Sequence, residues 1–486
     1  MKSCIQYVLT SSIFYLAIVS SVYASEPFHN IHGFYGERAA GLGGAFTAIA
    51  DDPSGAYYNP AGLGFTYNDR ISISASNFKD TKRKYINIDT PGQTYNQTHQ
   101  GFDPNFIGLL KNFDRWKFAF SIVNTYNYAY NRADQVNFPL VSPTINTTRN
   151  FTKERYSQLL VGPSVAYLLT DKLSFGATLY YLNDTKDVSR TQFQQFSDLS
   201  YVMRTFVDNR RTSGLMPVIG VQYQPIDKVS LGASFRHIHV MGGNRLYNEF
   251  YLDSTRRPGS TAVDFIEGTG VASSAIEAGV LTQRPALNTR IPETSELRVG
   301  VAYFPTSRFL ASFDIIRTSG FRAKQNQNEV SSLGSRVTYT ITDTEVRELT
   351  RVATTNFATG MEYYLADTFS VLAGFYTNEP NTKPISWTES ALDLYLQSQF
   401  GNQIQASSGD TTVRYRLPRS GTDPRNEYSR NRGISLGFSW VTSKSSVSVT
   451  YIREVGAGNS RIDANSLSQR FEYEANSIYI MVSSKN

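Results

Sequence analysis

Apolar and polar positions alternate along much of the chain, which is typical of β-strands whose two faces meet different surroundings. One face of residues 173–181 consists of Leu173, Phe175, Ala177, Leu179 and Tyr181, and the other of small or polar residues. The same alternation recurs, with apolar faces made by Val229, Leu231, Ala233 and Phe235, by Trp116, Phe118, Phe120 and Ile122, and by Ile434, Leu436, Phe438 and Trp440. The pattern predicts many strands, each with one apolar face.

Short turn sequences join these strands in pairs. They lie at residues 112–115, 170–172, 225–228, 305–308, 366–368 and 442–445. The flanks of the six turns supply twelve strands, and an opening strand (about 70–88) and a closing strand (about 470–483) bring the prediction to about fourteen.

The connections on the other side are long, near residues 89–103, 131–155, 185–212, 241–293, 323–352, 379–430 and 456–469. Short turns at one end and long loops at the other are typical of antiparallel β-barrels of the bacterial outer membrane. The fold class predicted is therefore all-β, a transmembrane barrel of about 14 strands. The alternative is a soluble β-sandwich, which would need neither the one-sided loops nor an apolar outer face on every strand.

Composition fits this picture. The 486 residues include 31 Tyr and 30 Phe, and only 18% are charged. Pairs such as Tyr180-Tyr181 and Tyr363-Tyr364 suit an interfacial aromatic girdle, although they could equally be ordinary strand residues. The net charge of +6 is spread along the chain without a basic block, which argues against nucleic-acid binding.

The first 24 residues have the features of a signal peptide: Lys2, an apolar run from about Ile5 to Val19, and a cleavage site of small residues ending at Ala24. Cys4, the only cysteine, lies within it, so the mature chain is expected to lack disulfides and cysteine-bound metals. No later run approaches 18 apolar residues, so a membrane-spanning form can only be a closed barrel.

Two predicted strands contain proline, Pro163 and Pro217. A closed barrel has no free edge, and proline cannot donate to a ladder, so a bulge or kink is expected at each.

Residues 25–69 precede the first strand and read as neither strand nor regular helix. The segment Gly36–Leu63 is rich in Gly and Ala and contains turn signals at residues 51–55 and 59–60. Side chains alone fill a barrel of about eight strands, so a wider one needs a plug or remains an open pore. The domain division predicted is a signal peptide (1–24), an N-terminal hatch (25–69) and the barrel (70–486).

The sequence ADDPSGAYYNPAGL in this segment resembles the N-terminal hatch of the FadL/OMPP1/TodX family, with the triplet Asn59-Pro60-Ala61 matching its motif. The stretches 292–303 and 360–365 resemble two of the family's hairpins. The resemblance implies a fourteen-stranded barrel with a hatch motif that includes Gly36, Asp51 and Asp52. It also implies passive outer-membrane uptake of long-chain fatty acids or other hydrophobic compounds, without enzymatic activity or a cofactor.

The end of the chain departs from the family pattern, which bears on the assembly signal, and the hatch motif is shared with a second family, which leaves the function open. The chain ends Val482-Ser-Ser-Lys-Asn486, whereas the family's last strand ends on an aromatic residue. A related outer-membrane family that serves protein secretion shares the Gly/Ala-rich front and an Asn-Pro-Ala. The alternative is therefore a non-transporting barrel that acts as a secretion partner or adhesin.

Candidate cargo contacts lie in the loops and the hatch. A three-to-four-residue spacing predicts one helical stripe in the loop 185–212, made by Phe193, Phe196, Leu199, Val202 and Phe206. A second helix in the loop 379–430 would include Ala391 and Leu392. These stripes would form an external apolar groove, or the loops would simply pack on one another.

Within the hatch, Arg38 is the candidate for a cargo carboxylate, since a guanidinium binds carboxylates through two bonds. The alternative is a structural pair with Glu37, Asp51 or Asp52. Leu42 and Phe46 are further candidate cargo contacts, and Asn59-Pro60-Ala61 is predicted to cap a turn and fix the hatch to the wall.

Enzymatic and metal sites have weak support. Gly41-Leu-Gly43-Gly44 is a poor dinucleotide fingerprint, and His237 with His239 would supply only two metal ligands. The partners expected are a hydrophobic small molecule and the lipopolysaccharide or other lipid of the outer membrane, and the barrel is expected to be a monomer.

Overall fold

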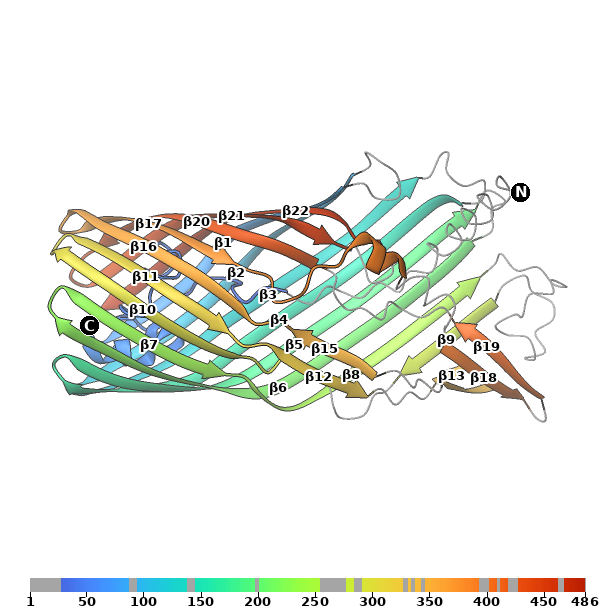
Figure 1. Ribbon diagram of the computed structural model, residues 1–486, viewed down its shortest axis with the longest axis horizontal. Helices are drawn as coiled ribbons and strands as arrows, with labels where there is room; N and C mark the ends of the chain where they lie inside the picture. Colours follow the sequence, from blue (N-terminus) through green and yellow to red (C-terminus); the bar gives the residue numbers. More distant parts are fainter. Residues whose placement is uncertain are drawn as a thin grey trace.

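Fourteen antiparallel strands form a closed barrel in the computed structural model, which confirms the predicted count (Figure 1). The strands are β1 (Arg70–Ile86), β2 (Thr94–Phe113), β3 (Trp116–Asn137), β4 (Ile145–Thr170), β5 (Leu173–Phe196), β6 (Tyr201–Ile226), β7 (Val229–His237), β10 (Ser295–Thr306), β11 (Phe309–Thr318), β16 (Thr354–Ala366), β17 (Phe369–Asn378), β20 (Glu427–Val441), β21 (Ser445–Ser460) and β22 (Gln469–Lys485). The barrel closes because β5 pairs with both β4 and β6.

The structure describes residues 28–86, 94–137, 145–196, 201–253, 277–283, 291–326, 331–333, 337–341, 346–392, 402–408, 411–417, 427–461 and 467–485. The predicted signal peptide lies outside them. Among these residues, no helix is long and apolar enough to cross a bilayer.

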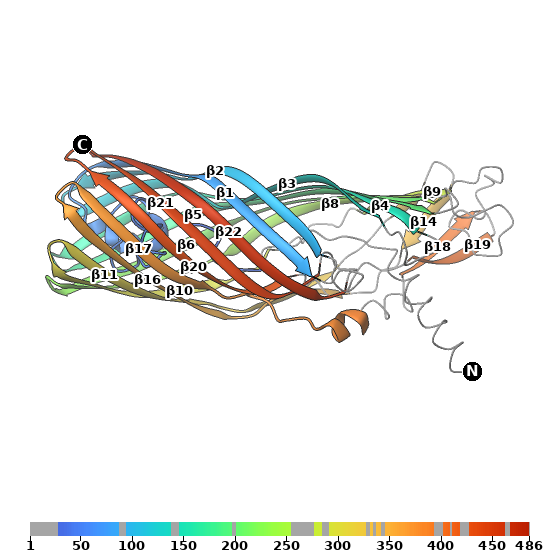
Figure 2. The same ribbon diagram turned by 90° about the horizontal axis from the view of Figure 1, so that it is seen from above.

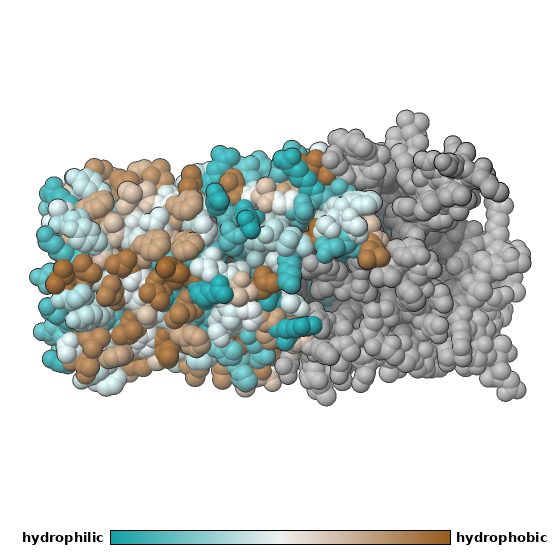
Figure 3. Space-filling view, in the orientation of Figure 1, coloured by the Kyte–Doolittle hydropathy of each residue, from teal (hydrophilic) through white to brown (hydrophobic). Residues whose placement is uncertain are grey.

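The predicted alternation sets the two faces of the wall. On β5, Phe175, Leu179 and Tyr181 are exposed, whereas Ser174 and Thr178 are buried. The apolar outer stretch from Leu173 to Tyr181 has nine residues, the length that a tilted strand needs to span a bilayer. Figure 3 shows the resulting apolar belt on the half of the barrel that carries the turns.

All six predicted turns are present, at the ends of β2, β4, β6, β10, β16 and β20. Exposed aromatic residues gather close to them: Phe113, Trp116, Tyr223, Tyr303, Tyr363 and Trp440. Such a girdle marks a membrane–water interface, and the short turns mark it as the periplasmic one. Of the predicted tyrosine pairs, Tyr181 and Tyr363 face outward, whereas Tyr180 is fully buried inside.

A bulge or kink is predicted at each proline; neither position is a bulge, but neither lies in two unbroken ladders. No register shift falls at Pro163 or Pro217 in the ladders of β4, β5 and β6. Each proline instead coincides with a local loss of pairing in one of its two ladders. Pro163 has no partner in β5, and Pro217 lies opposite the break between β7 and β8 (His239–Asp253). The missing N–H is therefore accommodated by unpaired positions.

The loops predicted at 131–155 and 185–212 are largely strand, which is a correction. β3 to β6 run for 22 to 26 residues, so they continue far beyond the belt at the external end. The predicted connections 241–293, 323–352 and 379–430 also contain strands: β8, β9 (Glu277–Gln283), β12 (Phe321–Asn326), β13 (Ser331–Leu333), β14 (Val337–Ile341), β15 (Val346–Arg351), β18 (Asn402–Ser408) and β19 (Thr411–Leu417).

Residues 28–69 lie inside the barrel at the end that carries the turns (Figure 1). They contain a single helical turn, α2 (Gly55–Tyr58), followed by a 3-10 helix, η1 (Pro60–Phe65). Residues 39–50 are all buried. We call residues 28–69 the N-terminal segment.

Candidate functional site

Inward-facing glycines form the seat of the N-terminal segment. A Cβ on Gly232 of β7 would lie 2.2 Å from the carbonyl oxygen of Thr47, and one on Gly176 of β5 would lie 2.3 Å from the backbone of Pro60. Gly360 of β16 approaches Leu42 in the same way. Any larger residue at these positions would collide with backbone, so the glycines permit the segment to pack directly on the wall.

The Asn59 side chain joins three parts of the molecule. Its Oδ1 accepts a hydrogen bond from Ala61 N at 3.2 Å, which caps η1, and Pro60 occupies the first position of that helix. Its Nδ2 donates to Thr47 O at 2.8 Å and to Val221 O of β6 at 3.1 Å. This side chain therefore holds the turn, the preceding loop and the wall together.

Gly36 and Asp52 shape the start of the segment. Gly36 has φ +86° and lies against Ser54, where a Cβ would collide. Asp52 accepts from Ser54 N at 2.7 Å and from Glu37 N at 3.3 Å. Burial is the largest influence on the pKa of Asp52 and raises it. These contacts assign Asp52 a structural place in the loop.

Arg38 is fully engaged with two carboxylates. Its Nη1 donates to both Asp51 oxygens at 3.0 Å, while Nε and Nη2 donate to Glu362 Oε2 of β16 at 2.9 and 2.7 Å. Burial lowers the pKa of Arg38, but Glu362 and Asp51 outweigh it and raise the pKa well above its ordinary value. The geometry is that of the structural alternative, with Asp51 and a wall carboxylate as the partners.

The substitution Arg38→Ala is expected to loosen the N-terminal segment, because Glu362, 1% exposed, would keep its charge without a partner. Loss of one member of a buried pair costs about 3 kcal/mol or more. Hydrogen exchange of residues 36–52 should therefore accelerate. The control is Arg308→Ala, which breaks an exposed pair with Asp367 and should leave the same amides unchanged. Equal exchange in both variants would contradict a role of the Arg38–Glu362 pair in holding the N-terminal segment.

A second carboxylate anchors the loop that precedes Asn59. Asp314 Oδ2 of β11 accepts from Phe46 N and Thr47 N, both at 3.0 Å, and from Thr47 Oγ1 at 2.6 Å. Asp314 and Glu362 thus fix the N-terminal segment from two adjacent strands, β11 and β16.

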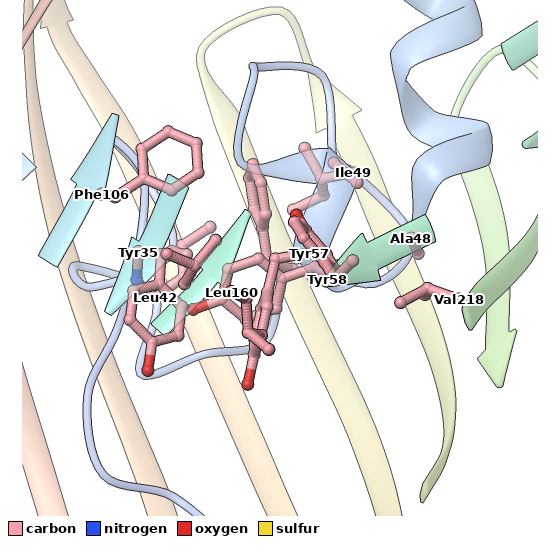
Figure 4. Packing of buried hydrophobic residues seen from close by; sticks show 14 of the residues in the cluster. Tyr35, Leu42, Ala48, Ile49, Tyr57, Tyr58, Phe106, Leu160 and Val218 are labelled. Carbon is pink, nitrogen blue, oxygen red and sulfur yellow. Dashed lines mark hydrogen bonds between the residues drawn. The ribbon is translucent and has the colours of Figure 1, made fainter. Parts of the chain in front are cut away.

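A cavity of about 170 Å³ lies between the N-terminal segment and the wall. Its apolar lining combines Tyr35, Tyr57 and Tyr58 of the segment with Leu160 of β4 (Figure 4). Met216 and Ile316 of the strands, and Ile238 and Ile291 from the connections between strands, complete it. An apolar cavity of about 150 Å³ takes up a molecule of benzene. The volume therefore matches a single aromatic ring or a short length of alkyl chain.

Charged side chains support the tyrosines of the cavity. Glu296 lies between Arg236, at 2.6 Å, and Arg298, at 2.5 Å. The Arg236 guanidinium lies 4.2 Å from the centre of the Tyr57 ring, and that of Arg298 lies 5.3 Å from the centre of the Tyr58 ring. Such cation–π contacts stabilise the ring positions when water is excluded, so this charged triad sets the shape of the cavity.

The predicted cargo contacts in the N-terminal segment do not line this cavity. Leu42 and Phe46 are fully buried in the packing between the segment and the wall. The residues that do line it, such as Leu160 and Met216, are inward-facing positions of long strands. Their alternation was readable from the sequence, but which of them meet across the lumen was not.

The helical stripe predicted over residues 193–206 is wrong. Phe193 and Phe196 belong to β5, and Val202 and Phe206 belong to β6, with Phe193 paired to Met203. Leu199 lies outside the described residues. Of the second predicted helix, residues 387–392 are helical and include Ala391 and Leu392.

The wall opens between β2 and β3. The two strands pair only from Phe106–Val123 to Phe113–Trp116, although β2 continues to Thr94 and β3 to Asn137. Each keeps its other neighbour, β1 or β4, so the two edges diverge toward the external end (Figure 2). Tyr35 OH donates to Thr125 O at 3.2 Å on the free edge of β3. Because Thr125 and Tyr126 also line the cavity, the cavity reaches this opening.

Near the opening, His32 is held neutral. Its ring packs against Tyr126 with centroids 4.9 Å apart, and burial, then His29 and Lys79, lower its pKa to about 3. The stability that the neutral ring provides is complete above about pH 6.5 and is lost as the pH falls toward 3.

Acidification to pH 5 should therefore weaken this end of the segment by about 2 kcal/mol. Hydrogen exchange of residues 28–36 is expected to accelerate between pH 7 and 5, after correction for the intrinsic rate, and His32→Gln should remove most of that change. The control is His239→Gln, at an exposed position of β8. An unchanged pH dependence in His32→Gln would contradict the assignment.

Metal binding finds no support in the described part of the chain, where no group of three or more His, Cys, Asp or Glu is placed to hold an ion. His237 ends β7 and His239 begins β8, and the two strands are separated by Ile238.

Taken together, a closed fourteen-stranded barrel with an apolar outer belt, an internal segment and a cavity lined by both apolar and polar side chains defines a transport barrel of the outer membrane. The chain belongs to the outer membrane protein transport family (OMPP1/FadL/TodX), whose sequence profile matches residues 33–386. It is thus an outer-membrane transport protein and not an enzyme.

Solved structures share the fold at low sequence identity. A FadL homologue of Pseudomonas aeruginosa is 15% identical with a TM-score of 0.54, and covers 95% of this chain and 99% of its own. The Pseudomonas putida toluene transporter TodX is 12% identical with a TM-score of 0.56, and covers 94% and 99%. No curated protein sequence matches the chain.

Proposed function

We propose that hydrophobic molecules bind in the cavity beside Tyr57 and Tyr58 and leave sideways through the opening between β2 and β3. The observation that supports this route is that Thr125 and Tyr126 line the cavity and also lie on the edge of β3 that is not paired with β2. In this mechanism the N-terminal segment is a hatch that closes the periplasmic end, and one chain, which closes the barrel alone, acts as a monomer.

The cargo proposed first is a compound the size of one aromatic ring. The cavity of about 170 Å³ supports this, since it is near the size that holds benzene. TodX is described as a toluene transporter, and CymD, at 11% identity and a TM-score of 0.52, as a monoaromatic hydrocarbon channel. These descriptions belong to those proteins and make the same cargo a reasonable proposal here.

Long-chain fatty acids are the second cargo to test. A smaller, more polar chamber of about 70 Å³ shares His29, Ile31, His32 and Tyr126 with the cavity. An alkyl chain in the cavity could extend into this chamber, which contains Lys79 and Arg83 as partners for a carboxylate. Arg83 itself lies 3.6 Å from Glu427, a longer contact than the bonds of 2.7–3.0 Å that hold Arg38, so Arg38 is the less favourable partner.

Uptake of labelled toluene and labelled oleate by cells that lack their own channel, with and without this protein, separates the possibilities. Faster entry of toluene alone supports the first cargo, and faster entry of oleate supports the second. If neither enters faster while the barrel is folded in the membrane, the transport proposal fails, and a secretion or adhesion role replaces it.

A further inference from the structure

The apolar belt ends on the external side at one row of residues. On β20, β21, β22 and β1 this row consists of the exposed side chains Ile434, Tyr451, Ile478 and Phe78. Figure 3 shows the same change from apolar to polar surface on the face it displays. Because the turns mark the periplasmic side, this border lies at the headgroups of the outer leaflet.

Directly beyond the border, cations project from the same outer face. Arg432 and Arg453 come first, on β20 and β21, whereas on β1 Asp80 comes first and Lys82 next; all three cations are exposed. In the ladder of β20 and β21, Arg453 lies opposite Ile434. In the ladder of β22 and β1, Glu474 lies opposite Lys82. Arg430 and Lys84 follow two residues farther out, and Arg470 lies opposite Ile86, beyond Lys84. We call these six residues the basic collar.

Carboxylates hold most of the collar in place. Arg453 Nη2 lies 3.2 Å from Glu474, Arg470 Nη2 lies 3.1 Å from Glu472, and Arg430 Nε lies 3.5 Å from Glu379. Lys84 and Lys82 contact Glu472 and Asp80 at 3.5 and 3.8 Å. Arg432 is the exception, since none of the described carboxylates lies within ion-pair distance of it. Six cations face four carboxylates, so the collar keeps a positive excess.

The partner that fits is a phosphorylated lipid headgroup. A guanidinium forms paired, charge-assisted hydrogen bonds with phosphate. Cations at the headgroup level of an anionic leaflet are attracted to it. The outer leaflet of this membrane is built from a glycolipid whose phosphates lie just above the acyl chains, at the height of Arg432 and Arg453. We propose that the basic collar binds the phosphates of this lipopolysaccharide and so fixes the barrel in the outer leaflet.

Binding of defined lipids to the purified barrel tests the collar. The variant carries Arg432→Gln, Arg453→Gln and Lys82→Gln. A matched control removes three exposed cations at the periplasmic turns, with Lys172→Gln, Lys228→Gln and Lys444→Gln. Native mass spectrometry would measure affinity for bisphosphorylated lipopolysaccharide, for its dephosphorylated form and for inorganic phosphate as a competitor. A heat-modifiability gel establishes that each barrel is folded.

We expect the collar variant to lose at least tenfold in affinity for the phosphorylated lipid, and the control to match the unsubstituted protein. Inorganic phosphate at equal concentration should not compete. Equal affinity in the collar variant, equal binding of the dephosphorylated lipid, or full competition by inorganic phosphate would each overturn the proposal. If the triple variant does not fold, Arg432→Gln compared with Arg432→Lys tests the same contact, with retention expected only for lysine. None of these results depends on the cargo.

Discussion

Replacing Gly232 by valine is expected to unseat the N-terminal segment and convert the barrel into an open pore. A Cβ at this position of β7 would lie 2.2 Å from Thr47 O and 2.8 Å from Ala48 Cα, and both neighbours are backbone atoms that cannot rotate away. Overpacking of this kind costs about 1–3 kcal/mol even where side chains can adjust. The strand itself tolerates valine well, so the barrel should still close.

Single-channel conductance in a planar bilayer measures the outcome. Gly232→Val should conduct ions continuously, whereas the unsubstituted protein should conduct little. The control is Gly242→Val in β8, where nothing lies within 4 Å of the added Cβ. That variant is expected to remain closed. A closed Gly232→Val barrel would mean that the segment can move on the wall and still fill the lumen.

The barrel was predictable because its signal is local. Alternation places Phe175 and Leu179 outward and Ser174 inward, and a turn such as residues 170–172 fixes the pairing of the strands that flank it. Once the apolar face of every strand points to lipid, the number of turns gives the number of strands. Nothing in this reasoning requires knowledge of distant contacts.

The boundaries of the strands were less predictable where the surroundings change. Beyond the membrane both faces of β5 and β6 meet water or polar groups, so alternation fades and the segment 185–212 resembles a loop. The spacing of Phe193, Phe196 and Phe206 then matched a helix by coincidence. Backbone pairing with the neighbouring strand makes this segment a β-hairpin, and such pairing cannot be detected from hydrophobic periodicity.

The site depends on contacts across the lumen, which a single sequence does not reveal. Arg38 was a reasonable candidate for a ligand carboxylate until its partner Glu362, 324 positions away, became visible. The opening between β2 and β3 is likewise a missing set of hydrogen bonds, and much of the unpaired part of each strand, residues 94–103 and 131–137, falls in segments that the sequence predicted as loops. The small size of the cavity also depends on how tyrosines of the N-terminal segment meet strands β4 and β6.

Replacing Leu160 by tryptophan is expected to stop uptake while the barrel stays intact. Leu160 is fully buried on the inner face of β4 and lines the cavity beside Tyr57 and Tyr58 (Figure 4). The indole of tryptophan is much larger than the side chain of leucine and would occupy much of a cavity of about 170 Å³. Uptake of labelled toluene should fall at least tenfold, with no change in the amount of folded protein in the membrane.

The matched control is Leu179→Trp, the same substitution at a lipid-facing position of β5 that is 49% exposed. It should leave uptake unchanged, because tryptophan is accepted at membrane-facing positions. The opposite change, Leu160→Ala, enlarges the cavity and should increase the uptake of two-ring compounds relative to toluene, at a stability cost of about 2–5 kcal/mol. If Leu160→Trp takes up toluene at the normal rate, cargo does not pass through this cavity. The route would then have to run along the external face of the N-terminal segment directly to the opening between β2 and β3.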